Sequence, residues 1–150
     1  TKVDSNLNQL SEEDAESLVL SGLDKLIVSI DGTTPETYSK YRVGGDFNRV
    51  IDNLKLLIEK KRQLNKIYPH ISWQFLVFRH NEHEIEKVRR IGRDLGIDVG
   101  ITKAFIGNKD WIPLNQDEGG LYVPVLTLVL FLQALFYVLR VYGQVPYLHL

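Results

Sequence analysis

Side chains that could bind a metal ion occur close together at His80, His83 and Glu84. Imidazole and carboxylate groups are common zinc ligands, and a zinc site combines at least three protein ligands in a fixed geometry. Here the two histidines are three residues apart at the expected start of a helix, and no further ligand stands near them. We therefore expect solvated loop residues at these positions and no metal site in this chain.

Polar residues also stand at and just beyond the end of an apolar run over Leu26–Ile30, which has the pattern of a buried strand. Ser29 and Asp31 lie where this run ends, and both residue types either cap a turn or contact a ligand. Arg42 follows, and an arginine either forms a surface ion pair or clamps a carboxylate through two parallel hydrogen bonds. The residues alone leave both alternatives open at each position.

Other catalytic patterns cannot be argued from the sequence. Gly44 and Gly45 lack the spacing of a dinucleotide-binding or P-loop fingerprint, so we expect them only to turn the chain. No Ser–His–Asp or Cys–His arrangement stands out, and most carboxylates fall on the polar faces of expected helices. Trp73 and Trp111 are expected to be packing residues.

Strand and helix patterns alternate about four times along the chain, which predicts an α/β fold. Strands that alternate with helices form a parallel sheet through right-handed crossovers. The expected strands are Lys2–Ser5, Leu26–Ile30, Ile71–Phe78, and Asp98 to Ala104 or Phe105.

Four helices are expected between these strands. Each should begin at a polar residue that accepts a hydrogen bond from the first turn, and glycine is favoured where a helix ends. Apolar residues at three- and four-residue steps give a helix one buried face. The signals are a Ser11–Asp14 capping box with an end at Gly22, a cap at Thr33 or Thr34 with Pro35, an apolar face from Phe47 to Ile58, and an Asn81–Glu84 capping box with an end at Gly96.

The composition excludes one class of partner. The 150 residues include 18 Lys and Arg against 19 Asp and Glu, a formal net charge of −1, and 44% are hydrophobic. Proteins that bind nucleic-acid backbones carry a basic excess, which this chain lacks, so we expect no nucleic-acid partner. The charges also change along the chain, because Arg140 is the only charged residue after Glu118.

Five short motifs follow one another at plausible spacing between Asn6 and Pro113. They are a TNG-like turn at Ser5-Asn6-Leu7-Asn8, SIDG at Ser29 to Gly32, YR.GG.F at Tyr41 to Phe47, N..E at Asn81 to Glu84, and W.P at Trp111 to Pro113. Each motif is weak alone. Together, and in this order, they resemble the radical S-adenosylmethionine (radical SAM) enzymes of the SPASM-containing kind.

The resemblance implies both a fold and a site. The family fold has about six strand–helix units, so the chain would form part of a (βα)6 partial TIM-like barrel and cover its third to sixth units. Active sites of such barrels lie at the carboxyl ends of the strands, which would place Asn6, Ser29, Asp31 and Gln74 near the mouth. Family members hold SAM through polar residues after the SIDG strand and an arginine beyond it. Carried over, this implies that Ser29 and Arg42 contact the cofactor, with Asn6 as a weaker candidate.

The iron–sulfur chemistry of that family has no ligands in this chain. A [4Fe–4S] cluster is held by cysteine thiolates, and the sequence contains no cysteine. The family's CxxxCxxC motif would lie before Thr1, and its SPASM cysteines would lie after Pro113. We therefore interpret residues 1–116 as an internal fragment of the barrel that does not cleave SAM by itself, because that chemistry belongs to the cluster.

An apolar tail at residues 117–150 follows this fragment and carries no charge over residues 119–139. Such a run is long enough to span a bilayer, so one interpretation is a C-terminal membrane anchor. A second makes Val123–Leu132 a buried strand and the remainder a helix. The third, which we favour, is an out-of-frame reading, because the composition changes abruptly where the family's cysteine region would begin. We expect a cytoplasmic location, with membrane association through the tail as the alternative.

Three hypotheses for function follow. The first is a catalytically silent fragment of a radical SAM/SPASM protein, whose intact relatives cleave SAM reductively to a 5′-deoxyadenosyl radical. The second is a non-catalytic α/β binding module, associated with a membrane through its tail, and the third is an ordinary complete α/β domain without a cofactor. An arc of a barrel would leave two sheet edges unpaired and one apolar face uncovered, so we also expect the chain to associate.

Overall fold

The computed structural model of the protein describes residues 1–104 and 109–114. The chain divides into two units, Thr1–Gly120 and Leu121–Leu150, and every described residue belongs to the first. Our expectations for the tail at residues 117–150, including a membrane anchor over residues 119–139, therefore lie outside the described residues. Within the described part, no helix combines the length and the apolar character that crossing a membrane requires.

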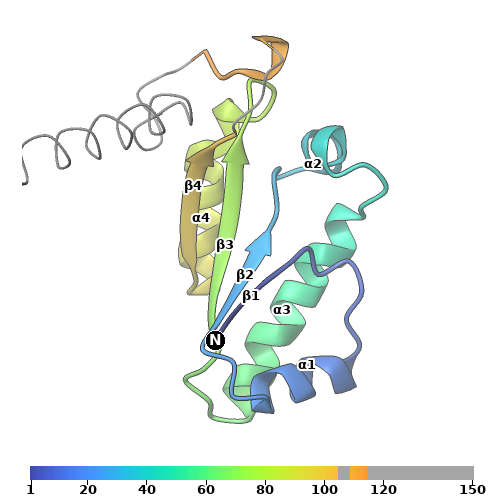
Figure 1. The fold of residues 1–150 in the computed structure, drawn as a ribbon, viewed down its shortest axis with the longest axis vertical. Helices are drawn as coiled ribbons and strands as arrows, with labels where there is room; N and C mark the ends of the chain where they lie inside the picture. Colours follow the sequence, from blue (N-terminus) through green and yellow to red (C-terminus); the bar gives the residue numbers. More distant parts are fainter. Residues whose placement is uncertain (105–108, 115–150) are drawn as a thin grey trace, which may run out of the picture. The chain divides into compact units, whose positions relative to one another are not determined.

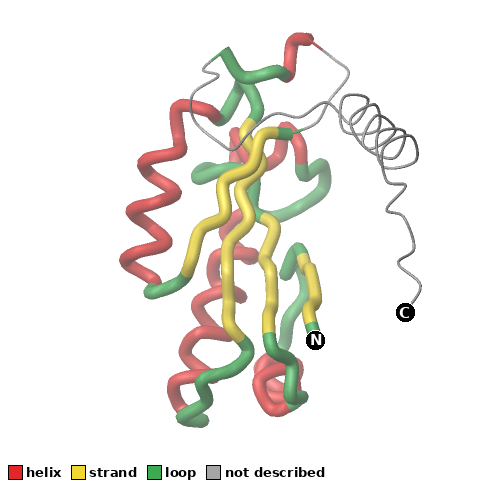
Figure 2. The backbone as a smooth tube through the Cα atoms, turned by 60° about the vertical axis from the view of Figure 1, so that its left-hand side comes forward, coloured by secondary structure: helices red, strands yellow, loops and turns green. Residues whose placement is uncertain are grey.

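Four parallel strands form one sheet, and their order in space is their order in the sequence (Figures 1 and 2). At least one helix separates each strand from the next, as parallel pairing requires. The arrangement confirms the expected α/β fold and is consistent with part of a TIM-like barrel. The strands are β1 (Lys2–Ser5), β2 (Lys25–Ser29), β3 (His70–Val77) and β4 (Asp98–Lys103).

Capping interactions mark the beginnings of the first three helices. Ser11 and Asp14 form the expected capping box, in which each side chain accepts a hydrogen bond from the main-chain N–H of the other. Thr34 rather than Thr33 caps the second helix and shares a second capping box with Thr37. The helical segments are α1 (Glu12–Leu20), α2 (Pro35–Tyr41), α3 (Phe47–Gln63), η1 (Glu82–Glu84), α4 (Ile85–Leu95) and η2 (Lys109–Trp111).

One face of the sheet packs against the helices and forms the core. Side chains alternate between the two faces along a strand, so Val28 of β2 and its register partner Trp73 of β3 point toward the same face, where both are fully buried. The burial of Trp73 confirms its expected role in packing. The core on this face joins Ala15 and Val19 of α1, Val50, Leu54 and Leu57 of α3, Val88 of α4, and Leu26, Val28, Ile71, Trp73, Phe75 and Val77 of the sheet.

The other face of the sheet carries the alternate residues, which we call the open face. Register places Ile27 beside Ser72 and Ser29 beside Gln74 on this face. Our expectation of an uncovered apolar face is therefore wrong, because the alternation in β3 sends its large apolar side chains to the helices and polar ones to the open face. The open-face residues are Lys2, Asp4, Lys25, Ile27, Ser29, His70, Ser72, Gln74, Leu76, Asp98, Gly100 and Thr102.

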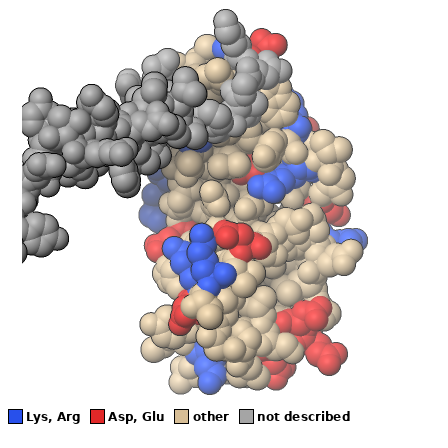
Figure 3. Space-filling view, in the orientation of Figure 1, with Lys and Arg blue, Asp and Glu red and all other residues tan. Residues whose placement is uncertain are grey.

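The charged side chains are mixed in sign over the face of the molecule shown in Figure 3. Lys and Arg side chains lie among Asp and Glu side chains there, and no broad patch of one sign is visible. This distribution agrees with the near-neutral net charge of the sequence, and a basic stripe of the kind that tracks a phosphate backbone is missing from this view.

Candidate functional site

The carboxyl end of β2 and the middle of the longer strand β3 bring two of the predicted mouth residues together. Ser29 is the last residue of β2, and its register partner on the open face is Gln74 of β3. Both side chains are half-buried. Among the described residues, the Ser29 hydroxyl has no hydrogen-bond partner, so it can donate or accept one bond to a ligand.

Asn6 lies one residue beyond the end of β1, where Ser5 pairs with Val28 of β2. It is therefore level with Ser29 at the same edge of the sheet. The Asn6 side chain is exposed, and its Oδ1 accepts a hydrogen bond from the Asn8 N–H at 3.2 Å. This local turn uses one lone pair of the carbonyl oxygen, so its second lone pair and the amide nitrogen remain for a ligand.

Strand β2 separates from β3 at Asp31. The Ile30 N–H still donates to the Gln74 carbonyl at 3.0 Å, and the next ladder bond would join the Leu76 N–H to the Ile30 carbonyl. Instead, Asp31 Oδ1 accepts from the Leu76 N–H at 2.7 Å. The Ile30 carbonyl accepts from Trp73 Nε1 at 2.6 Å. Side chains therefore satisfy both main-chain groups that the separation leaves without a ladder partner.

Arg42 forms an ion pair with Asp31, and the Nε–Oδ2 distance is 2.6 Å. The Asp31 side chain is fully buried, whereas 27% of the Arg42 side chain is exposed. The Arg42 guanidinium also lies over the Tyr41 ring, with Cζ 5.2 Å from the ring centroid. Arg42 is therefore half of a partly buried pair rather than a member of an exposed one, and its contact with SAM remains a prediction.

The pKa of Asp31 is raised above its usual value by burial, which disfavours the charged carboxylate. The hydrogen bond from the Leu76 N–H and the positive charge of Arg42 act in the opposite direction. Neither Asp31 nor Ser29 caps α2, since Thr34 has that role. The sequence could not reveal the burial of Asp31 or its ion pair with Arg42. A carboxylate at the end of a strand has the same sequence pattern whether it is solvated in a turn or buried.

Glu84 is a buried carboxylate that connects two turns far apart in the sequence. It accepts hydrogen bonds from the Thr33 N–H at 3.0 Å, from Thr33 Oγ1 at 2.6 Å and from Thr37 Oγ1 at 3.0 Å. Only 4% of the residue is exposed. Our expectation of a solvated Glu84 is therefore wrong, because the turn after β2 packs over the start of η1.

Asn81 does not form the expected capping box with Glu84 either. Its Oδ1 accepts from the Phe78 N–H at 2.7 Å. Its Nδ2 donates to the carbonyl of Asp31 at 3.0 Å and to that of Leu76 at 2.9 Å. Asn81 and Glu84 thus both reach across to the turn after β2, and the N..E pattern serves a tertiary contact instead of a local cap.

His80 belongs to an aromatic cluster, which we define as Tyr41, Phe78, His80 and Trp111. The His80 ring stacks on Phe78 with centroids 5.3 Å apart and meets Trp111 edge-on at 5.4 Å. Burial and the positive charge of Lys40 lower the His80 pKa. The half-buried His80 thus differs from the expected solvated residue, while His83 is exposed as expected. No group of three or more metal-ligating side chains occurs among the described residues.

Two glycines of the motifs allow the turn after β2 to pack closely. A Cβ atom at Gly32 would lie 2.4 Å from the main-chain nitrogen of Tyr38, so only glycine fits beneath the first turn of α2. A Cβ at Gly45 would lie 2.9 Å from the Tyr38 hydroxyl. Gly44 has a φ of 80° and turns the chain as expected, whereas Gly45 also makes room for a buried ring.

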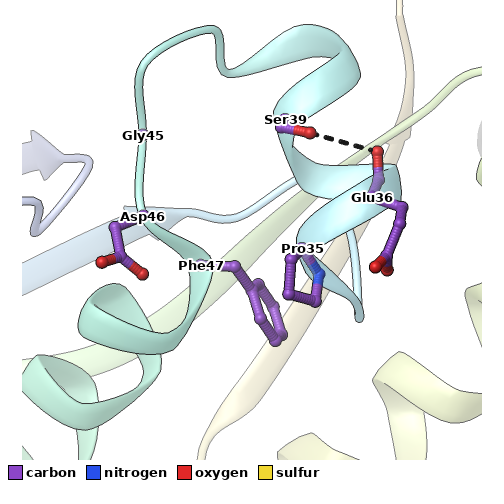
Figure 4. A pocket seen from close by; sticks show the side chains of 6 residues that line it. All are labelled: Pro35, Glu36, Ser39, Gly45, Asp46 and Phe47. Carbon is purple, nitrogen blue, oxygen red and sulfur yellow. Dashed lines mark hydrogen bonds between the residues drawn. The ribbon is translucent and has the colours of Figure 1, made fainter.

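A cavity of about 430 Å³ lies between α2 and α3 (Figure 4). Its lining shares no residue with the open face. Asp46 in its wall already caps α3 by accepting from the Arg49 N–H at 3.1 Å, and Ser39 donates to the Glu36 carbonyl. These local contacts leave no converging set of free polar groups. The lining residues are Pro35, Glu36, Ser39, Gly45, Asp46 and Phe47.

A curated protein similar to this chain is named "Probable GTP 3′,8-cyclase" and comes from Methanocaldococcus jannaschii. The two sequences are 30% identical over 113 residues, which cover 75% of this chain and 34% of the relative. The chain thus spans about a third of the length of the curated relative that it matches. A scan against models of protein families gave no match.

That relative is a radical SAM enzyme, so the match supports the radical SAM resemblance that the five motifs carry. It does not bear on the SPASM type.

The residues of the site fit the two implied cofactors differently. The guanidinium of Arg42 and the hydroxyl of Ser29 are suited to the carboxylate and polar groups of SAM. A [4Fe–4S] cluster needs thiolates, and this chain has no cysteine to supply them. Its donor set therefore does not fit the cluster.

Proposed function

We propose that this chain is a fragment of a radical SAM protein of the SPASM-containing type and does not cleave SAM by itself. One observation carries the proposal: Ser29 and Gln74 lie side by side where β2 ends, and Arg42 pairs with Asp31, two residues after Ser29, in a chain that lacks cysteine. The site could thus contribute to holding SAM, but no residue in this chain could hold the cluster.

In this proposal each site residue has a separate role toward SAM. Arg42 would bind the carboxylate of the methionine portion, and the Ser29 hydroxyl would bind a polar group of the methionine or ribose portion. Asn6 would add a weaker contact through its amide nitrogen. In intact relatives the cluster supplies the electron that cleaves SAM to a 5′-deoxyadenosyl radical.

Anaerobic reconstitution of the full chain with iron and sulfide tests the part of the proposal that concerns catalysis, namely that this chain holds no cluster and does not cleave SAM by itself. We expect no charge-transfer absorption in the visible range and no stoichiometric iron, because no thiolate is present. A stable, stoichiometric cluster would contradict the proposal.

Titration with SAM tests the part of the proposal that concerns SAM binding. We expect affinity no tighter than about millimolar, which corresponds to roughly 4 kcal/mol, since the cluster iron that binds the amino and carboxylate groups in the family is missing. Micromolar binding that Arg42→Ala abolishes would show that the site is complete without the cluster. No binding even at high concentration, in a chain shown to be folded, would argue against a SAM site altogether.

The DNA around the coding region tests the fragment interpretation. We expect a CxxxCxxC and a GGEP motif upstream in the same or a neighbouring frame.

For the tail, another frame should restore a charged, cysteine-containing continuation after Trp111-Ile112-Pro113. If both other frames close at stop codons, the out-of-frame interpretation fails. Partition of the full chain into liposomes would then test the membrane alternative for residues 119–139.

A non-catalytic binding module is the second candidate, and the sheet edges favour it. In the described sheet β1 pairs only with β2, and β4 pairs only with β3. Unpaired strand edges readily add a strand from another chain. Size-exclusion chromatography with light scattering distinguishes the cases: a complete domain gives a monodisperse monomer with a cooperative melt, whereas a fragment associates or needs a partner.

A further inference from the structure

We infer that Asp31 is a positioning residue: it holds the Arg42 guanidinium through Nε, so that the terminal nitrogens of Arg42 can clamp the carboxylate of an amino-acid ligand. The inference rests on the proposed function, in which that ligand is SAM. It assigns Asp31 no contact with the ligand. The role of Asp31 is to fix the direction of the arginine side chain.

Asp31 is itself held firmly from the neighbouring strand. Its Oδ1 accepts from the Leu76 N–H at 2.7 Å, and its main-chain carbonyl accepts from Asn81 Nδ2 at 3.0 Å. The side chain is fully buried. Because Leu76 belongs to β3 and Asn81 follows it, the carboxylate has one fixed position relative to the sheet.

Arg42 is fixed at its main chain and along its side chain. Its N–H donates to the Tyr38 carbonyl at 2.9 Å, and its carbonyl accepts from the Gly45 N–H at 3.0 Å. Asp31 then binds Nε, and the Tyr41 ring lies against the guanidinium. An exposed arginine would lose considerable side-chain entropy on binding a ligand, whereas much of that cost is already met in folding here.

The geometry leaves one edge of the guanidinium for a ligand. Arginine presents its donors in a planar fork, and a pair of parallel N–H···O bonds with a carboxylate is its strongest recognition mode. Asp31 occupies the Nε donor. Among the described residues, neither terminal nitrogen of Arg42 has a hydrogen-bond partner, and the side chain is partly exposed. The edge formed by the two terminal nitrogens therefore has a fixed direction and no protein partner among the described residues.

Nitrogen-detected NMR spectra of the full chain test the first step of the inference. The Arg42 Nε–H, identified by its loss in Arg42→Lys, should resonate downfield and exchange slowly with water, because it donates to a buried carboxylate. Asp31→Asn keeps the shape and the acceptor for Leu76 but removes the charge, and it should abolish that signature. The matched control is Glu59→Gln, which changes the exposed Arg62–Glu59 pair and should leave the Arg42 signal unchanged.

Titration with two probes tests the second step. SAM and decarboxylated SAM differ in the carboxylate alone, so their affinity ratio reports carboxylate recognition. We expect the wild-type chain and Glu59→Gln to bind SAM more tightly than the decarboxylated probe. Asp31→Asn should reduce affinity for SAM about tenfold and leave affinity for the decarboxylated probe unchanged. A general loss of structure would weaken both probes equally.

Each possible result of these two experiments either supports or overturns the inference that Asp31 positions Arg42. An Arg42 Nε–H signature that survives Asp31→Asn overturns the inference, as does equal wild-type affinity for the two probes. If the wild-type chain binds neither probe, the proposed SAM site fails and the ligand role of Arg42 fails with it. The inference alone fails, and the SAM site stands, if wild-type discrimination persists unchanged in Asp31→Asn while Arg42→Lys removes it.

Discussion

The two faces of the sheet differ in what their residues do. On the helix-covered face, Val28, Trp73 and Phe75 are fully buried within one apolar core. On the open face, the neighbouring Ser29 and Gln74 are half-buried and polar. The same two strands thus provide a stabilising surface on one side and a surface with groups free to bind a ligand on the other.

The difference teaches where the motifs of this chain act. Several of their polar residues make contacts at the end of the sheet, as Asp31 does with Arg42 and Glu84 does with Thr33. Ser29 makes no such contact, because its hydroxyl lies on the open face without a hydrogen-bond partner among the described residues. In this chain, several motif residues therefore support the structure at this end of the sheet, while Ser29 remains available for contact with a ligand.

Trp73→Ala should have the largest effect on the comparison between the faces. Removing a fully buried tryptophan leaves a cavity and also deprives the Ile30 carbonyl of its donor, so we expect a loss of about 3–5 kcal/mol of unfolding free energy. The control is Gln74→Ala, the next residue on the open face, with a change within about 0.5 kcal/mol. Urea denaturation measures both, and equal losses would contradict the difference between the faces.

Glu84→Ala should have the next largest effect, because it leaves the buried N–H and hydroxyl donors of Thr33 without their acceptor. We expect a loss of about 2 kcal/mol. The matched control is Glu86→Ala, which removes a carboxylate exposed on α4 and paired only at the surface with Arg89. If the two variants lose the same stability in urea, the contact between the two turns contributes nothing beyond a surface pair.

The pH dependence of stability should reveal the burial of Asp31. Its pKa is raised on folding above the usual value near 3.8. The stability contribution of such a group is fully present below the unfolded pKa and is lost as the pH rises through the folded pKa. The unfolding free energy of the wild type minus that of Asp31→Asn should therefore fall as the pH rises from about 4 toward neutrality. A difference that grows with pH would show that the Arg42 ion pair outweighs burial.

Ser29→Ala should have the smallest effect on stability. Its hydroxyl has no partner among the described residues, so we expect a change within about 0.5 kcal/mol in urea. The weak affinity for SAM should nevertheless fall, and NMR titration can measure it. Unchanged affinity would remove Ser29 from the proposed site, and a large loss of stability would show that the open face takes part in the core.

The sequence by itself determined the local structure of this protein. The alternation of Ile71, Trp73 and Phe75 with polar residues predicted β3, and the Ser11–Asp14 pair predicted the start of α1. Both predictions are confirmed, because strand alternation and helix capping depend on residues that are close together in the sequence. The parallel sheet followed from the alternation of these elements, since parallel neighbours require a helical connection.

Only the tertiary structure decided what the polar motif residues contact. Asn81 and Glu84 have the spacing of a helix cap, yet they bind groups about fifty residues earlier in the chain, at Asp31 and Thr33. The same holds for Arg42, whose sequence context suits a surface residue but whose partner is a fully buried carboxylate. The sequence does not show which partner a hydrogen-bonding side chain will have. That partner depends on which turns the packed helices bring to the same end of the sheet.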